Sequence, residues 1–184
     1  MNARERVLAA INHQEPEGIP VDLGSTPSSG ISASAHYNLK RSIGRPDWPT
    51  QVYDVVQQIA QPNDEMLDHF RIDVIDIGRA FDDRPEDWYA IDLPDGTPVQ
   101  FPTWFKPSPQ PDGAWDVFNQ DGVRVATMPL GANFFDQTCF PYLDGYPATY
   151  DDLAQTMPLI HWAGLAHSPW DLSLIHISEP TRPY

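Results

Sequence analysis

The sequence is poor in cysteine and in basic residues, and it has no long apolar run. One cysteine, Cys139, excludes an internal disulfide framework and a zinc site built from several cysteines of this chain. With 11 basic against 26 acidic residues, the formal net charge is −15. Nucleic acids and acidic membranes would be repelled, so we expect neither as a partner. No stretch approaches the ~20 apolar residues of a membrane span, and the start lacks signal-peptide features, so we expect a cytoplasmic protein.

The residues that are abundant are apolar residues and prolines. Apolar residues make up 41% of the 184 residues, which is enough to build the core of one ordinary domain. The 20 prolines are about twice the usual share of ~5%. They cluster between Pro94 and Pro111, which predicts a loop-rich middle of the chain.

The first part of the chain alternates between helix and strand signals. Asn2 with Glu5 resembles a capping box, and further N-cap candidates are Ser32 and either Asn63 or Asp64. Residues 32–42, 52–60 and 64–70 are predicted helices, whereas residues 19–23 and 73–78 are predicted strands. This order predicts an α/β architecture with a parallel sheet.

The middle of the chain has the pattern of antiparallel hairpins. The Asp-Gly pairs that begin at Asp95, Asp112 and Asp121 are turn signals between short β-prone runs at residues 99–101, 115–118 and 123–128. We therefore predict a hairpin insertion over about residues 92–130. A helix from about Tyr150 to Ala166 follows it, within a single unit of residues 1–171.

The last residues do not look like part of the same protein. Residues 172–182 match, residue by residue, the reading-frame translation of a transposon-type sequencing adapter. We therefore expect residues 172–184 to be a non-native tail that is not part of the fold. His176 and Glu179 of this tail are not candidate ligands.

Several segments are informative when they are taken in order, among them residues 4–13 (RERVLAAINH), 15–22 (EPEGIPVD), 72–77 (IDVIDI) and 134–142 (FFDQTCFPY). Together they resemble the uroporphyrinogen decarboxylase family, whose superfamily also holds corrinoid-dependent methyltransferases. The resemblance implies a (β/α)8 TIM barrel, which typically needs ~250 residues. We therefore expect an incomplete barrel of the first few β/α units, an amino-terminal fragment that exposes a sheet edge and is inactive by itself.

The resemblance also implies a choice between two chemistries. Decarboxylases of the family place arginines after the first strand to bind substrate carboxylates, but residues 23–30 contain none. They also carry an aspartate at the end of the next strand for the pyrrole N–H groups, and Asp76 falls earlier than that position. The methyltransferases hold zinc with a His-x-Cys pair and a distant cysteine, but Cys139 has no histidine two residues before it.

We therefore expect corrinoid (methylcobamide)-linked methyl transfer, with zinc and a corrinoid as cofactors of a longer parent protein. Uroporphyrinogen decarboxylation in tetrapyrrole biosynthesis and a noncatalytic tetrapyrrole- or corrinoid-binding protein are the alternatives. The expected partner is a small tetrapyrrole or corrinoid, either free or carried by a corrinoid protein.

The candidate site residues follow the two predicted strands. The loop after the first strand could bind an anion or a corrinoid amide, or it could be an ordinary connection between a strand and a helix. Its candidate substrate-binding residues are Gly24, Ser25, Thr26, Ser29 and Gly30. Arg79 could hold a carboxylate or form a structural ion pair with Asp82 or Asp83. Asp76 is a candidate general acid or base only if its side chain faces the site. We interpret a further group as structural: His36, Trp104, Trp115, Phe118, Cys139, His161 and His167.

Overall fold

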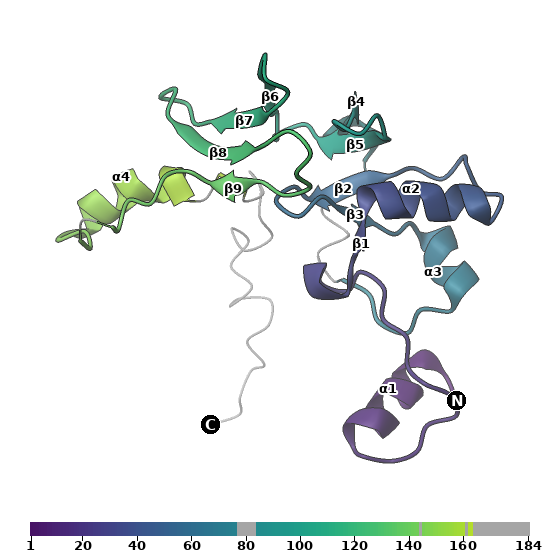
Figure 1. The fold of residues 1–184 in the computed structure, drawn as a ribbon. Helices are drawn as coiled ribbons and strands as arrows, with labels where there is room; N and C mark the ends of the chain where they lie inside the picture. Colours follow the sequence, from purple (N-terminus) through teal and green to yellow (C-terminus); the bar gives the residue numbers. More distant parts are fainter. Residues whose placement is uncertain (77–83, 144, 161, 164–184) are drawn as a thin grey trace, which may run out of the picture.

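A computed structural model describes residues 1–76, 84–143, 145–160 and 162–163. Two sheets lie beside each other, with the helices around the edges of this pair (Figure 1). The first sheet has the order β1-β3-β2-β5-β4, formed by β1 (Ile31–Ser32), β2 (Gln51–Asp54), β3 (Ile59–Gln61), β4 (Trp88–Asp92) and β5 (Pro98–Pro102). The second has the order β6-β7-β8-β9, formed by β6 (Ser108–Pro109), β7 (Trp115–Phe118), β8 (Arg124–Met128) and β9 (Asp136–Gln137).

The helices are short. They are α1 (Ala3–Ile11), α2 (Ala33–Ser42), α3 (Asp64–Phe70) and α4 (Tyr150–Ile160), with 3₁₀ turns η1 (Pro27–Ser29) and η3 (Pro85–Asp87). Within the ranges given above, no helix has the length and apolar character that crossing a membrane requires.

The predicted α/β fold, an incomplete TIM barrel with a hairpin insertion, is wrong. Strand pairing in both sheets is antiparallel except between β2 and β5, which pair in parallel through Gln51 and Gln100. A barrel of β/α units needs successive parallel strands joined by helices. The predicted strands at residues 19–23 and 73–78 meet in one parallel bridge, between Asp22 and Val74.

The helix predicted over residues 52–60 is also wrong, because this segment forms the β2–β3 hairpin. The Asp54 carboxylate accepts hydrogen bonds from the backbone N–H groups of Val56 (2.9 Å) and Gln57 (3.0 Å), which fixes a turn. Gln58 then takes a left-handed conformation, with φ of 56°. The residues on both sides of this turn include β-branched ones, which favour strands. The apolar residues of the same segment are also spaced as on one face of a helix, so the sequence alone fits both structures.

The predicted helix starts are confirmed. Asn2 and Glu5 form a capping box at α1, and the side chains of Ser32 and Asn63 accept from the backbone at the starts of α2 and α3. At α4, Thr149 and Asp152 exchange backbone-to-side-chain hydrogen bonds of 3.2 and 3.1 Å. These interactions are local in sequence, so they do not depend on the predicted barrel.

The predicted hairpin strands are confirmed, but they are not an insertion into a parallel sheet. The β4–β5 hairpin extends the first sheet, and β7–β8 forms the centre of the second. Both sheets share one core, in which the ring of Phe101 meets those of Phe105 and Trp115 edge to face at 5.4 and 6.2 Å. Trp115 therefore packs as expected, whereas Phe118 is 47% exposed.

Candidate functional site

The amino-terminal segment and the segment after α3 run side by side and end at the same place. The Asp22–Val74 bridge is parallel, and the Asp73 N–H donates to the Val21 carbonyl at 2.8 Å. The Asp73 carboxylate, 2% exposed, accepts from the Val21 N–H at 3.0 Å and forms an ion pair with Arg6 of α1. Because the pairing is parallel, Asp22 and Asp76 come from the same end of the two segments.

A tyrosine hydroxyl lies near this end. Tyr53 is on β2, and its hydroxyl is buried without a hydrogen-bond partner in the described part of the chain. Burial raises the pKa of Tyr53 most, and the charges of Asp76, Asp54 and Asp22 raise it further. Tyr53 is therefore a neutral phenol, and we call it, together with the three aspartates whose charges act on it, the Tyr53 cluster. Such a cluster offers oxygen acceptors and one O–H donor.

The loop of residues 24–30 uses its own backbone donors. The Ser25 N–H and hydroxyl donate to the Asp22 carboxylate at 3.0 and 2.5 Å. The N–H groups of Thr26 and Ser29 donate to each other's oxygens at 3.2 and 3.1 Å, and that of Gly24 donates to the Ser29 carbonyl at 3.0 Å. An anion that bound these N–H groups would have to displace these bonds. The loop's main contribution is to orient Asp22.

Two glycines hold this loop close to its neighbours. Gly24 has a φ of +83°, and a Cβ there would lie 2.8 Å from the Pro62 ring. A Cβ at Gly30 would lie 2.3 Å from a side-chain carbon of Ile59. The chain can approach β3 and the start of α3 this closely only because both positions are glycine.

Comparisons of the chain with protein-family models, curated proteins and solved structures found no match. The resemblance to the uroporphyrinogen decarboxylase family therefore stays a prediction.

The described residues do not fit a zinc site. Among them, no group of three or more His, Cys, Asp or Glu side chains is arranged to hold a metal ion. The carboxylates of the Tyr53 cluster are thus not a metal centre in this geometry. Cys139, which we interpreted as structural, is a free and partly exposed thiol.

The structure brings together some of the predicted site residues and adds two others. Asp76 is half-buried and acts on Tyr53, and the loop lies against Asp22. Tyr53 was not predicted, because residues 52–60 were assigned to a helix. Asp22 was not predicted, because it lies within the predicted strand at residues 19–23 rather than in the loop after it. Arg79, with Asp82 and Asp83, lies outside the described residues, as do His161, His167 and the tail of residues 172–184.

Proposed function

We propose that the chain belongs to an enzyme of the uroporphyrinogen decarboxylase-like superfamily that carries out corrinoid-linked methyl transfer. In this proposal, the Tyr53 cluster receives N–H donors of the corrinoid. The observation that carries it is the buried Tyr53 hydroxyl, which has no partner in the described chain and feels the charges of three aspartates. A polar group in that state gains a full hydrogen bond when a ligand supplies its partner.

The charge of the cluster favours a corrinoid over uroporphyrinogen. Corrinoid side chains end in neutral carboxamides, whose N–H groups can donate to Asp22, Asp76 and the Tyr53 oxygen. Uroporphyrinogen carries eight carboxylates, which the three aspartates of the cluster and the net charge of −15 would repel. Residues 23–30 also contain no arginine to offset these carboxylates.

The residues of this chain would bind and orient, and the corrinoid would supply the methyl-transfer chemistry. Tyr53, held neutral, can donate its O–H to an amide carbonyl while it accepts from an N–H. Asp22 is fixed by Ser25 and can hold a carboxamide in one orientation. A cytoplasmic location is part of the same proposal.

A binding experiment on the full chain tests the proposal. Equilibrium dialysis with cyanocobalamin should show saturable binding, and Tyr53→Phe should weaken it about tenfold, the effect of one good hydrogen bond. Tyr89→Phe is the matched control: Tyr89 is also half-buried, but its hydroxyl already donates to the Phe105 carbonyl at 2.8 Å. Equal affinity of the two variants, or no binding by the unaltered chain, would contradict the proposal.

An activity experiment separates an enzyme from a binding protein. The longer parent protein, given methylcobalamin and a small thiol, should increase the rate at which the methyl group moves to sulfur with release of cob(I)alamin, whereas this chain alone is expected to bind without such an increase. Binding by the parent protein without such an increase would favour the noncatalytic alternative. Preferential binding of uroporphyrinogen, with loss of its carboxylates, would favour the decarboxylase alternative.

A further inference from the structure

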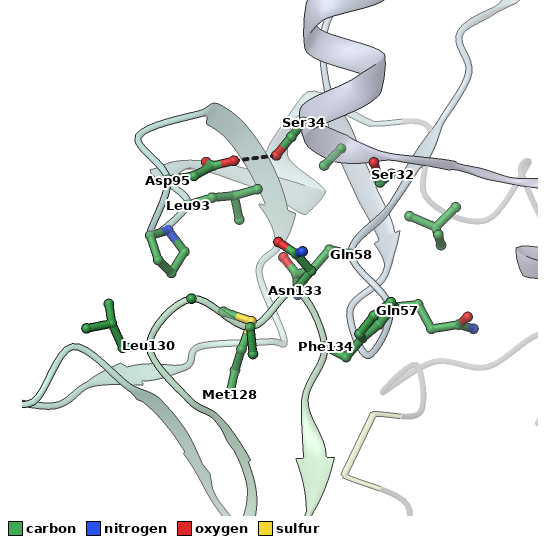
Figure 2. Close-up of a pocket in the computed structure, with 15 residues that line it drawn as sticks. Ser32, Ser34, Gln57, Gln58, Leu93, Asp95, Met128, Leu130, Asn133 and Phe134 are labelled. Carbon is green, nitrogen blue, oxygen red and sulfur yellow. Dashed lines mark hydrogen bonds between the residues drawn. The ribbon is translucent and has the colours of Figure 1, made fainter.

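A cavity lies at the junction of the two sheets. Its volume is about 590 Å³, within the ~300–1,000 Å³ typical of small-molecule sites. Four segments line it, namely residues 32–34, 57–59, 93–95 and 128–134 without Pro129 (Figure 2). Tyr53, Asp22 and Asp76 are not among its lining residues, so the cavity is distinct from the Tyr53 cluster.

The side-chain amide of Gln58 is part of the cavity wall, and only one of its two polar atoms has a hydrogen-bond partner in the described chain. Gln58 is 4% exposed, and its Nε2 donates to the Val55 carbonyl at 2.7 Å. That bond fixes the orientation of the amide, because a carbonyl can only accept. The Oε1 atom of Gln58 is buried and has no partner in the described chain. A buried acceptor without a donor is costly, and a ligand N–H would remove that cost.

The amino terminus of α2 forms another wall, but its polar groups are already engaged. The Ala33 N–H donates to the backbone carbonyl of Gln58 at 2.8 Å, and the Ser32 hydroxyl accepts from the Ala35 N–H at 3.4 Å. The Ser34 hydroxyl donates to the Asp95 carboxylate at 2.6 Å, as the dashed line in Figure 2 shows. The negative charge of the Asp95 carboxylate would repel a bound anion, so the amino terminus of α2 does not make this cavity an anion site.

Most of the remaining lining is apolar, and its two polar side chains, Gln57 and Asn133, are exposed. Ile59, Leu93 and Met128 are buried along the cavity, whereas Leu130 and Phe134 are 70% and 54% exposed. Exposed apolar side chains beside a cavity gain contact area when an apolar ligand enters. The lining therefore fits an uncharged, mainly apolar body with a polar edge toward Gln58.

We propose that this cavity binds a small uncharged aromatic molecule whose amide-type N–H donates to the Gln58 Oε1 atom. The ring lies against Met128 and Phe134. The site is independent of the corrinoid proposal, because the two share no residue.

Three probes of nearly equal size test the chemistry on the full chain by ligand-detected and protein-detected NMR. Benzamide offers the N–H donor, acetophenone has the same shape without it, and benzoate carries the negative charge that a helix terminus alone would attract. We expect saturable benzamide binding, with acetophenone about fivefold weaker, as expected for the loss of one neutral hydrogen bond. Benzoate should bind more weakly than either. No saturable benzamide binding, or affinity for acetophenone or benzoate equal to that for benzamide, overturns the proposal.

Two variants of exposed residues locate the site, and a third variant, of the buried Gln58, tests the hydrogen bond. Phe134 and Phe140 are both 54% exposed, but only Phe134 lines the cavity. Phe134→Ala should weaken benzamide binding several-fold, whereas Phe140→Ala should leave it unchanged. Gln58→Met keeps the side-chain length but removes the oxygen, so it should abolish the preference for benzamide over acetophenone. Equal effects of the two phenylalanine variants, or a preference retained in Gln58→Met, would refute the assignment.

Discussion

A buried histidine on α2 should make the stability of the fold depend on pH. His36 is completely buried, and its Nδ1 atom lies 3.2 Å from the Thr50 hydroxyl. Its Nε2 atom has no partner within the described residues. Burial, and to a lesser degree the charge of Lys40, lowers the pKa of His36 from 6.5 to about 4. The folded state therefore holds a neutral imidazole under conditions in which the unfolded chain binds a proton.

The size of the effect follows from the pKa shift. A pKa that is lower in the folded state means that the unfolded state binds more protons between pH 6.5 and about 4. The stability is thus fully present above the unfolded pKa and falls as the pH decreases through this window. At about 1.4 kcal/mol for each pKa unit, the total loss is on the order of 3 kcal/mol.

Urea denaturation at a series of pH values measures this loss. The unaltered chain should lose about 3 kcal/mol of unfolding free energy between pH 7 and pH 4 through His36, in addition to contributions from other groups. His36→Leu should remove that part of the slope, even though it also loses the contact with Thr50. The control His13→Asn, which removes an exposed histidine, should keep it. Parallel pH profiles for the unaltered chain and His36→Leu would refute the reasoning.

Three further predictions concern stability. Tyr53→Phe should leave the unfolding free energy unchanged or slightly higher, because it removes a buried hydroxyl that has no partner among the described residues. Tyr89→Phe should lower the unfolding free energy by about 1 kcal/mol, because it removes a hydroxyl that donates a hydrogen bond. Equal destabilisation of the two variants in urea titrations would contradict this. Gly30→Ala should lower the unfolding free energy by about 1–3 kcal/mol, because the new methyl group would lie 2.3 Å from the Ile59 side chain of β3. An unchanged melting temperature would argue against that packing. The hydrogen bonds to Arg6 and then to the Val21 N–H lower the pKa of Asp73, so their stabilisation is fully present above its ordinary pKa of 3.8 and is lost as the pH falls through the lower pKa of the folded state. Asp73→Asn should therefore speed amide exchange in α1 at pH 7, by a factor that shrinks as the pH falls below 3.8, and equal rates at pH 7 would exclude this ion pair.

The features that sequence predicted correctly are those with local causes. The caps of α1, α2 and α3 require a side chain and a backbone N–H three residues apart, and the sequence shows both. The hairpin turns at the Asp-Gly pairs are equally local, because glycine provides the positive φ, for instance 80° at Gly96.

The pairing of strands could not be read from the same signals. Residues 52–60 have apolar positions that suit a helix and β-branched residues that suit strands. The turn at Asp54 and the left-handed Gln58 decide between them. Apolar runs at residues 19–23 and 73–78 suggested central parallel strands, but they pair only through Asp22 and Val74 in the described chain. The spacing of apolar residues does not specify which partner a strand takes.

The candidate site was predictable only in part. Asp76 and the loop of residues 24–30 follow the predicted strands, so their position at one end of two parallel segments could be anticipated. Tyr53 joins them from a hairpin more than twenty residues away from either, through tertiary packing that no local pattern contains. The partly satisfied amide of Gln58 was hidden for the same reason, since the hairpin turn creates it.

Competition between cobalamin and uroporphyrin III for the full chain decides whether the Tyr53 cluster binds a corrinoid. Both are large tetrapyrrole-type macrocycles, but one carries neutral carboxamides and the other eight carboxylates. We expect that cyanocobalamin binds, that Tyr53→Phe weakens its binding about tenfold and that excess uroporphyrin III does not displace it. Tighter binding of uroporphyrin III, or cobalamin binding that is insensitive to Tyr53→Phe, would exclude a corrinoid site at this cluster.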